Sequence, residues 1–147
     1  MGKTTLLGLA EKLRYKSDRI DQKANEATKK VALKVVSYLV RNTPVDTSQA
    51  LSNWQVGIGA PVHTTINPIV YGSYGSTQAQ SAAGAIAKAQ LQLASKRPGQ
   101  PIFISNAIHY IKELDDGTIK SNSKPSGFVE RAMIIARNEA KDVKLNI

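Results

Sequence analysis

The chain has 147 residues, of which 41% are hydrophobic and 21% are charged, a composition that excludes a disordered chain and suits one domain with its own core. No apolar run approaches the ~20 residues that a membrane-spanning helix needs, so we expect no membrane contact. The sequence contains no cysteine, which excludes disulfides and thiolate chemistry.

The net charge of +9 is unevenly distributed along the chain. Residues 1–41 hold ten basic and four acidic residues, whereas residues 42–87 hold a single charge, Asp46. A basic helix can bind phosphate without sequence preference, but a solvated helix face explains the same pattern and is our preferred interpretation. The charge-poor middle indicates either strands bound to the core or a surface covered by another subunit.

Residues 5–42 follow a helical pattern that ends before Pro44, which cannot continue a helix. Apolar residues recur at spacings of three, four and seven, which places them on one stripe: Leu6, Leu9, Leu13, Ile20, Ala24, Ala27, Val31, Val35 and Tyr38. At ~1.5 Å per residue the helix would be up to about 55 Å long, more than the diameter of a small domain. We therefore expect either a break near residues 16–18 or a first half that packs on a neighbouring subunit.

The next segments predict strands. Residues 51–59 alternate apolar side chains with glutamine and glycine, which is the period of a half-buried strand. Residues 63–70 form a second extended run, in which Pro68 favours an edge strand or an irregular one.

The remaining elements follow from apolar spacing and from turn residues. We expect an alanine-rich helix capped by Ser76 or Thr77, a short buried strand, a short helix and a last helix, at residues 77–95, 101–105, 107–114 and 128–143. Residues 144–147 fit either a further strand or a frayed end. The predicted fold is α+β: a long N-terminal helix and two further helices on one antiparallel or mixed sheet of about three to five strands, in a single domain spanning residues 1–147.

The residues that could carry chemistry form no recognisable reactive group. His63 and His109 lack the spacing of metal ligands, and the acidic group of Glu113, Asp115 and Asp116 lacks the alternation of a calcium loop. We interpret those acids as solvated turn residues, and we expect no catalytic residue, no metal and no cofactor.

Four further side chains are given structural roles. Asp46 can accept hydrogen bonds that fix the turn after the first helix. Trp54 suits a core anchor whose indole N–H needs an acceptor. Tyr71 and Tyr74 suit core or interface positions, because no basic residue nearby supports nucleic-acid stacking.

Two blocks of sequence resemble a known family. The first is T-P-V-D-T at residues 43–47, followed by Leu51 and Trp54; the second runs from Asn106 through E-L-D-D-G at residues 113–117 to the segment at residues 125–132. In this order they are similar to the tail-completion or neck proteins of tailed bacteriophages, including minor tail protein Z types. Ser48 stands where the family usually has glycine. The motif and interface candidates are Pro44, Asp46, Thr47, Leu51, Trp54, Tyr110, Glu113, Gly117, Gly127 and Phe128.

The resemblance implies a structural virion protein and not an enzyme. Its subunits would form a homo-oligomeric ring of about six or twelve copies at the joint between head and tail. The ring would contact the portal or connector adaptor and the tail-tube or tail proteins, and phage DNA would pass through its lumen without sequence-specific binding. Assembly would take place in the host cytoplasm. The alternative, based on the basic first helix, is a small nucleic-acid-binding protein.

Overall fold

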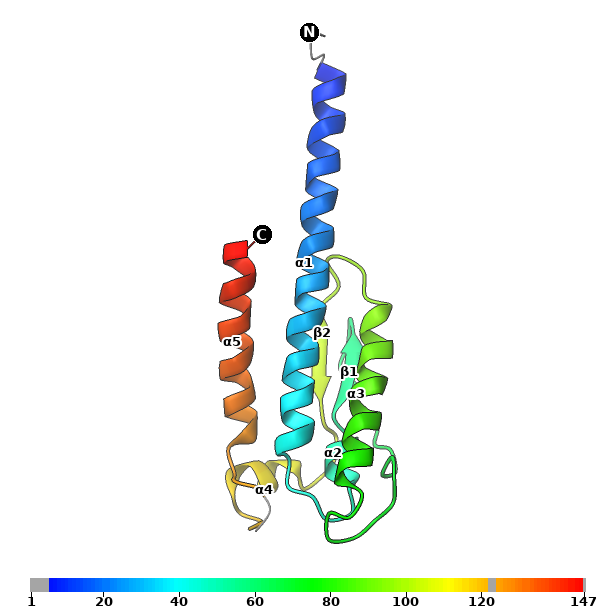
Figure 1. The fold of residues 1–147 in the computed structure, drawn as a ribbon, viewed down its shortest axis with the longest axis vertical. Helices are drawn as coiled ribbons and strands as arrows, with labels where there is room; N and C mark the ends of the chain where they lie inside the picture. The colour runs from blue at the N-terminus through cyan, green and yellow to red at the C-terminus, as the bar shows by residue number, and fades with distance from the viewer. Residues whose placement is uncertain (1–5, 122–123, 147) are drawn as a thin grey trace.

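The structure is a computed structural model that describes residues 6–121 and 124–146. Its elements, in chain order, are α1 (Leu6–Asn42), α2 (Gln49–Ser52), β1 (Gln55–Ile58), α3 (Gln78–Ala94), β2 (Ile102–Ser105), α4 (Ile111–Asp116) and α5 (Phe128–Asn146). Helix α1 is the axis of the molecule, with α5 on one side and the two strands and α3 on the other (Figure 1). The α+β class predicted from the sequence is confirmed.

Helix α1 runs without a break through residues 16–18, so the first of the two expected alternatives is wrong. No proline or glycine lies in that segment to interrupt the helix. Residues 9–23 are all exposed, and Asn25 is the first buried residue of α1. Its amide group donates to the carbonyl oxygen of Lys96 at 3.2 Å, which ties α1 to the end of α3. The N-terminal half of α1 therefore extends beyond the body of the molecule (Figure 1). The predicted start at Thr5 lies outside the described residues.

The core lies between the second half of α1, α3, the sheet and α5. Val36, Val40 and Leu51 are fully buried there. Trp54 is buried as expected, and its Nε1 donates a hydrogen bond of 2.7 Å to Thr43 Oγ1, so the indole N–H has its acceptor. The Trp54 ring meets Phe128 of α5 edge-on, with ring centroids 6.5 Å apart.

The sheet has two antiparallel strands, so the expectation of three to five is wrong for the described residues. Val56 pairs with Ile104, and Ile58 pairs with Ile102. Residues 60–70 do not join the sheet, because side chains bind their backbone instead: Ile66 N donates to Asn53 Oδ1 at 2.7 Å, and Ile69 N donates to Ser52 Oγ at 3.0 Å. This segment crosses β1 so closely that a Cβ on Gly57 would lie 2.0 Å from the carbonyl oxygen of Ala60.

Several helices and strands begin or end at residues other than those predicted from the sequence. Leu51 lies on α2 and not in the first strand, which begins only at Gln55. The predicted helix at residues 107–114 begins at Ile111, because Asn106 Oδ1 accepts the Ile108 N–H at 3.1 Å and closes a turn there. Strand β2 is only half-buried, contrary to expectation. Residues 144–146 continue α5, and Ile147 lies outside the described residues.

Helix α3 begins after Thr77 as expected, but the hydroxyl group of Thr77 does not cap it. That hydroxyl donates instead to the carbonyl oxygen of Val70 at 2.8 Å and so fixes the preceding loop. In the part of the chain that the structure describes, no helix is both long and apolar enough to cross a bilayer.

Candidate functional site

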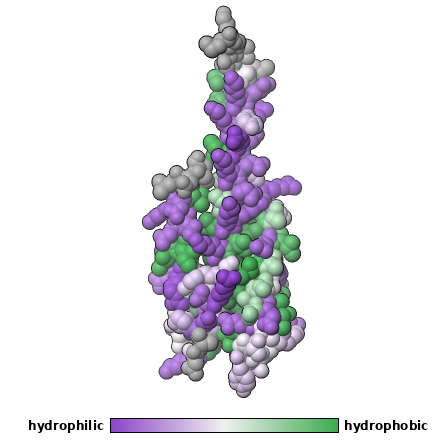
Figure 2. Space-filling model, in the orientation of Figure 1, coloured by the Kyte–Doolittle hydropathy of each residue, from purple (hydrophilic) through white to green (hydrophobic). Residues whose placement is uncertain are grey.

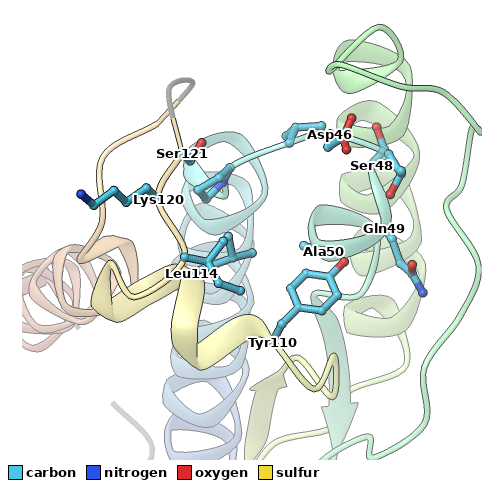
Figure 3. A pocket seen from close by; sticks show the side chains of 12 residues that line it. Asp46, Ser48, Gln49, Ala50, Tyr110, Leu114, Lys120 and Ser121 are labelled. Atoms are coloured by element: carbon cyan, nitrogen blue, oxygen red, sulfur yellow. The ribbon is translucent and has the colours of Figure 1, made fainter.

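The two sequence blocks meet at one hollow of about 510 Å³, at the end of the body opposite the free half of α1. One wall is the segment from Pro44 to Ala50, which connects α1 to α2. The other wall consists of Tyr110 and Leu114 at α4, with residues 119–121 after it. Figure 3 shows Tyr110 pointing from α4 toward the segment at residues 48–50.

The segment at residues 43–48 keeps its shape through buried groups. Thr43 is fully buried, and its N–H donates to the carbonyl oxygen of Leu39 at 3.0 Å, which closes the last turn of α1. Ser48 is also buried and has a φ angle of 68°, the left-handed region that glycine occupies without strain. The usual glycine of the family motif therefore has a conformational reason at this position. The Ser48 hydroxyl lies 3.0 Å from Thr77 Oγ1, which offers a compensating hydrogen bond.

Asp46 acts over a longer distance than the sequence suggested. Its carboxylate accepts the backbone N–H of Tyr74 at 2.6 Å, and its carbonyl oxygen accepts the N–H of Gly75 at 2.9 Å. Asp46 thus fixes the loop before α3, and the expectation of a purely local turn is wrong. Tyr74 has a φ angle of 54° and is 95% exposed, and Tyr71 is 70% exposed, so the core alternative is wrong for both and the interface alternative stays a prediction.

Tyr110 is the titratable side chain of the hollow whose environment is clearly perturbed. Its burial and, second, the negative charge of Asp46 raise the pKa of Tyr110 above the ordinary value of 10.0. The phenol O–H can donate a hydrogen bond into the hollow.

The second block forms the junction between α4 and α5. Gly117, with a φ angle of 84°, ends α4 in the left-handed conformation. Asp115 then receives the start of α5: its carboxylate accepts the Val129 N–H at 2.9 Å and its carbonyl oxygen accepts the Gly127 N–H at 2.7 Å. Asp115 is thus a helix cap and not a solvated turn residue.

Glu113 is also placed differently from the expectation. Its Oε2 atom is buried and has no hydrogen-bond partner among the described residues, so the interpretation as a solvated turn residue is wrong. Its carbonyl oxygen accepts the Ile119 N–H at 3.0 Å and orients the segment that follows α4.

The ten candidate residues therefore divide by location. Pro44, Asp46, Thr47 and Tyr110 line the hollow. Leu51, Trp54 and Phe128 are buried in the core. Glu113, Gly117 and Gly127 shape the turns around α4. The lining residues that were not among the candidates are Val45, Ser48, Gln49, Ala50, Leu114, Ile119, Lys120 and Ser121. The departure from glycine at Ser48 was the one available signal.

The hollow offers apolar walls, hydroxyl groups and two charges of opposite sign, from Asp46 and Lys120. Among the described residues, no group of three or more histidine, aspartate or glutamate side chains is placed to hold a metal ion. A hollow of this size with apolar walls and a few polar groups suits noncovalent binding of a ligand. Comparison with family models, with curated proteins and with solved structures gives no match for this chain.

Proposed function

We propose that the protein is a structural subunit of a tailed-bacteriophage neck, which assembles into a ring that completes the tail or joins it to the head. The ring would be part of the virion and would assemble in the host cytoplasm around the channel for the phage DNA. Two supports combine here: the resemblance of the two sequence blocks to neck proteins, and the two exposed sides of the fold described next.

The observation that carries the proposal is a pair of different apolar sides on opposite flanks of α1. On one flank, α3 has a single charged residue, Lys88, whose Nζ donates to Gln55 Oε1 at 3.1 Å. Leu91 of the same helix is 77% exposed. On the other flank, α5 exposes Met133 and Ile134 beside Arg137. Figure 1 places α3 and α5 on opposite sides of α1.

Two unlike sides on opposite flanks suit a head-to-tail contact, in which α5 of one copy lies against α3 of the next and rotation closes a ring. Contact between two α5 helices would bring Arg137 close to its own copy, whereas the uncharged side of α3 avoids that repulsion. Figure 2 shows apolar residues on the visible surface of the body, in contrast to the mainly hydrophilic extension of α1.

Cysteine cross-linking tests the contact, because the native chain contains no cysteine. We expect a mixture of Leu91→Cys and Ile134→Cys proteins to form dimers under oxidation. The double variant should form a ladder that ends at the ring size, while each single variant alone stays uncross-linked. Cross-linking of one single variant with itself would instead indicate a two-fold dimer and contradict the head-to-tail ring.

Light scattering over a concentration series tests assembly itself. Particles of about six or twelve subunits, alone or with the connector and tail proteins of the same phage, are the expected result. A strict monomer in both conditions would overturn the proposal.

A second candidate function is binding of nucleic acid, which one observation favours. The free half of α1 exposes five basic side chains, four on one face of the helix and Arg14 on the opposite face: Lys12, Arg14, Lys16, Arg19 and Lys23. Such a helix would bind duplex DNA with an affinity that falls steeply as salt concentration rises. A strict monomer that binds duplex DNA in this way would make nucleic-acid binding the leading function.

A further inference from the structure

The free half of α1 carries two parallel rows of side chains. The apolar row continues the helical stripe beyond the body, and the lysine row lies directly beside it at spacings of four and seven. All of these residues are exposed, and we call them the basic–apolar face: Leu9, Leu13 and Ile20 with Lys12, Lys16 and Lys23. Leu9, Leu13 and Ile20 are 46%, 60% and 50% exposed, so a row of apolar side chains and not a single leucine faces solvent.

Lower down the same helix, the chain covers the continuation of this face with α5. Ala27 of the apolar row and Lys23 and Lys30 of the lysine row line a hollow of about 650 Å³ between α1 and α5, together with Glu26 of α1, so Lys23 is where the covered part of the face begins. The α5 side of that hollow presents Glu139 and Asp142. Glu139 forms an ion pair with Lys34, one turn beyond Lys30. Helix α5 thus covers the face by placing carboxylates opposite the lysines.

This intramolecular contact ends where α5 ends, but the two rows on α1 continue. Ion pairs in the described residues join Lys29 with Glu26 and Lys34 with Glu139, and neither Lys12 nor Lys16 takes part in one. The free part of α1 therefore repeats the apolar and lysine rows that α5 covers, and no described helix places carboxylates opposite them there, as α5 does with Glu139 and Asp142.

A second copy of α1 does not match the face. Lys16 and Lys23 stand at positions of the seven-residue repeat that would face the partner helix in a pair of α1 helices. Two such helices would place these lysines at a shared seam, where like charges repel.

We propose that the basic–apolar face of α1 binds an acidic amphipathic helix of a partner protein, which lies along α1 in line with α5. The partner helix would present an apolar stripe to Leu9, Leu13 and Ile20, and carboxylates to Lys12 and Lys16. The inference rests on the proposed function for the existence of a larger assembly and specifies which kind of protein the ring contacts through its extended helix.

The test uses the full-length chain and two designed helical peptides of about three heptads. Both have leucine at the two apolar positions of each heptad; one has glutamate beside them and the other has lysine. We expect the wild-type chain to bind the glutamate peptide at least about tenfold more tightly than the lysine peptide. Fluorescence anisotropy of the labelled peptides measures both affinities.

Charge reversal identifies the surface. In the variant Lys12→Glu/Lys16→Glu the preference should invert toward the lysine peptide. Arg14 lies between these lysines in sequence but about 200° away around the helix from each, so Arg14→Glu/Arg97→Glu is a control with the same change of net charge. The control should keep the preference for glutamate. Far-ultraviolet circular dichroism checks that each variant keeps its helix content.

Leu13→Ser separates helix docking from simple charge attraction, because it leaves all lysines in place. We expect it to weaken binding of the glutamate peptide strongly. Equal affinity for the two peptides, or loss of the preference in the control variant, would overturn the inference. Binding of duplex DNA or anionic vesicles through Lys12 and Lys16, without a preference for the glutamate peptide, would assign the face to nucleic acid or membrane and would also overturn it.

Failure of this test and failure of the ring proposal have different signatures. Loss of peptide binding leaves the particle mass and the cross-link between residues 91 and 134 unchanged. Conversely, a strict monomer that binds the glutamate peptide would support the helix-binding face and contradict the ring proposal.

Discussion

The carboxylate of Asp46 accepts the backbone N–H of Tyr74, a residue 28 positions later, at 2.6 Å. Asp46 is the single charged residue between positions 42 and 87, so this contact uses the only charge available in a long uncharged segment. It holds Tyr74 in a left-handed conformation with its ring in solvent. The exposed aromatic ring of Tyr74 is therefore placed where a partner surface can cover it.

Replacement of Asp46 tests this contact. We expect Asp46→Ala to lower the free energy of unfolding by about 1 kcal/mol, because an exposed hydrogen bond to a carboxylate contributes at the lower end of the usual range. Asp46→Asn keeps an oxygen acceptor and should lose less. Urea unfolding monitored by fluorescence of Trp54, the only tryptophan, measures both. If both variants unfold at the wild-type urea concentration, the contact does not stabilise the loop.

The core positions were predictable because they follow local patterns. Trp54 belongs to an alternating apolar segment, and Phe128 begins a helical one; both are buried where the period places them. The end of the first helix before Pro44 was predictable. The sequence left open whether the helix breaks near residues 16–18 or extends beyond the body. Only the packing of Asn25 against Lys96 shows where the body of the molecule ends along α1.

Long-range polar contacts were not predictable from periodicity. The path of residues 60–70 depends on the side chains of Asn53 and Ser52, which remove backbone N–H groups that a third strand would have used. The sequence indicated two motifs and no hollow, because neither block shows that Pro44 and Tyr110 line opposite walls of one hollow. The burial of Glu113 Oε2 had no sequence signal, since acidic residues beside glycine usually mark a solvated turn.

Ser48 offers a comparison between a lost hydrogen bond and relieved backbone strain. Ser48→Ala removes the hydroxyl contact with Thr77 and keeps a Cβ in the left-handed region, whereas Ser48→Gly removes both. We expect Ser48→Ala to destabilise the protein more, with Ser48→Gly more stable than Ser48→Ala by roughly 0.5–1 kcal/mol. Thermal or urea unfolding of the two variants gives the difference. A more stable alanine variant would contradict a strained serine at this position.

The two phenylalanines of the chain allow a comparison of a buried position with an exposed one. Phe128 is 0% exposed and meets Trp54, while Phe103 on β2 is 37% exposed. We expect Phe128→Ala to lower the free energy of unfolding by about 3–5 kcal/mol through the cavity it leaves, and Phe103→Ala to cost clearly less. If Phe128→Ala fails to fold, Phe128→Leu provides the smaller step, which should still exceed the effect of Phe103→Leu. Similar losses at both positions would contradict the assignment of Phe128 to the core.

Tyr110 gives the hollow a measurable pH dependence. Its pKa in the folded protein lies above 10.0, because burial and the charge of Asp46 disfavour the phenolate. At pH values between 10.0 and the higher pKa of the folded protein, the unfolded chain releases the Tyr110 proton while the folded chain keeps it. The contribution to stability is therefore fully present below pH 10 and is lost as pH rises through the folded pKa.

The variant Tyr110→Phe isolates this contribution, since it has no proton to release. We expect the difference in unfolding free energy between the wild type and Tyr110→Phe to be constant below pH 10 and to shift against the wild type above it. Ultraviolet difference titration of the same pair should place the Tyr110 midpoint above 10.0. In Asp46→Asn the midpoint should move only part of the way back, because burial is the larger cause. Parallel stability profiles for wild type and Tyr110→Phe through this range would mean that Tyr110 faces solvent and that the hollow is open at that wall.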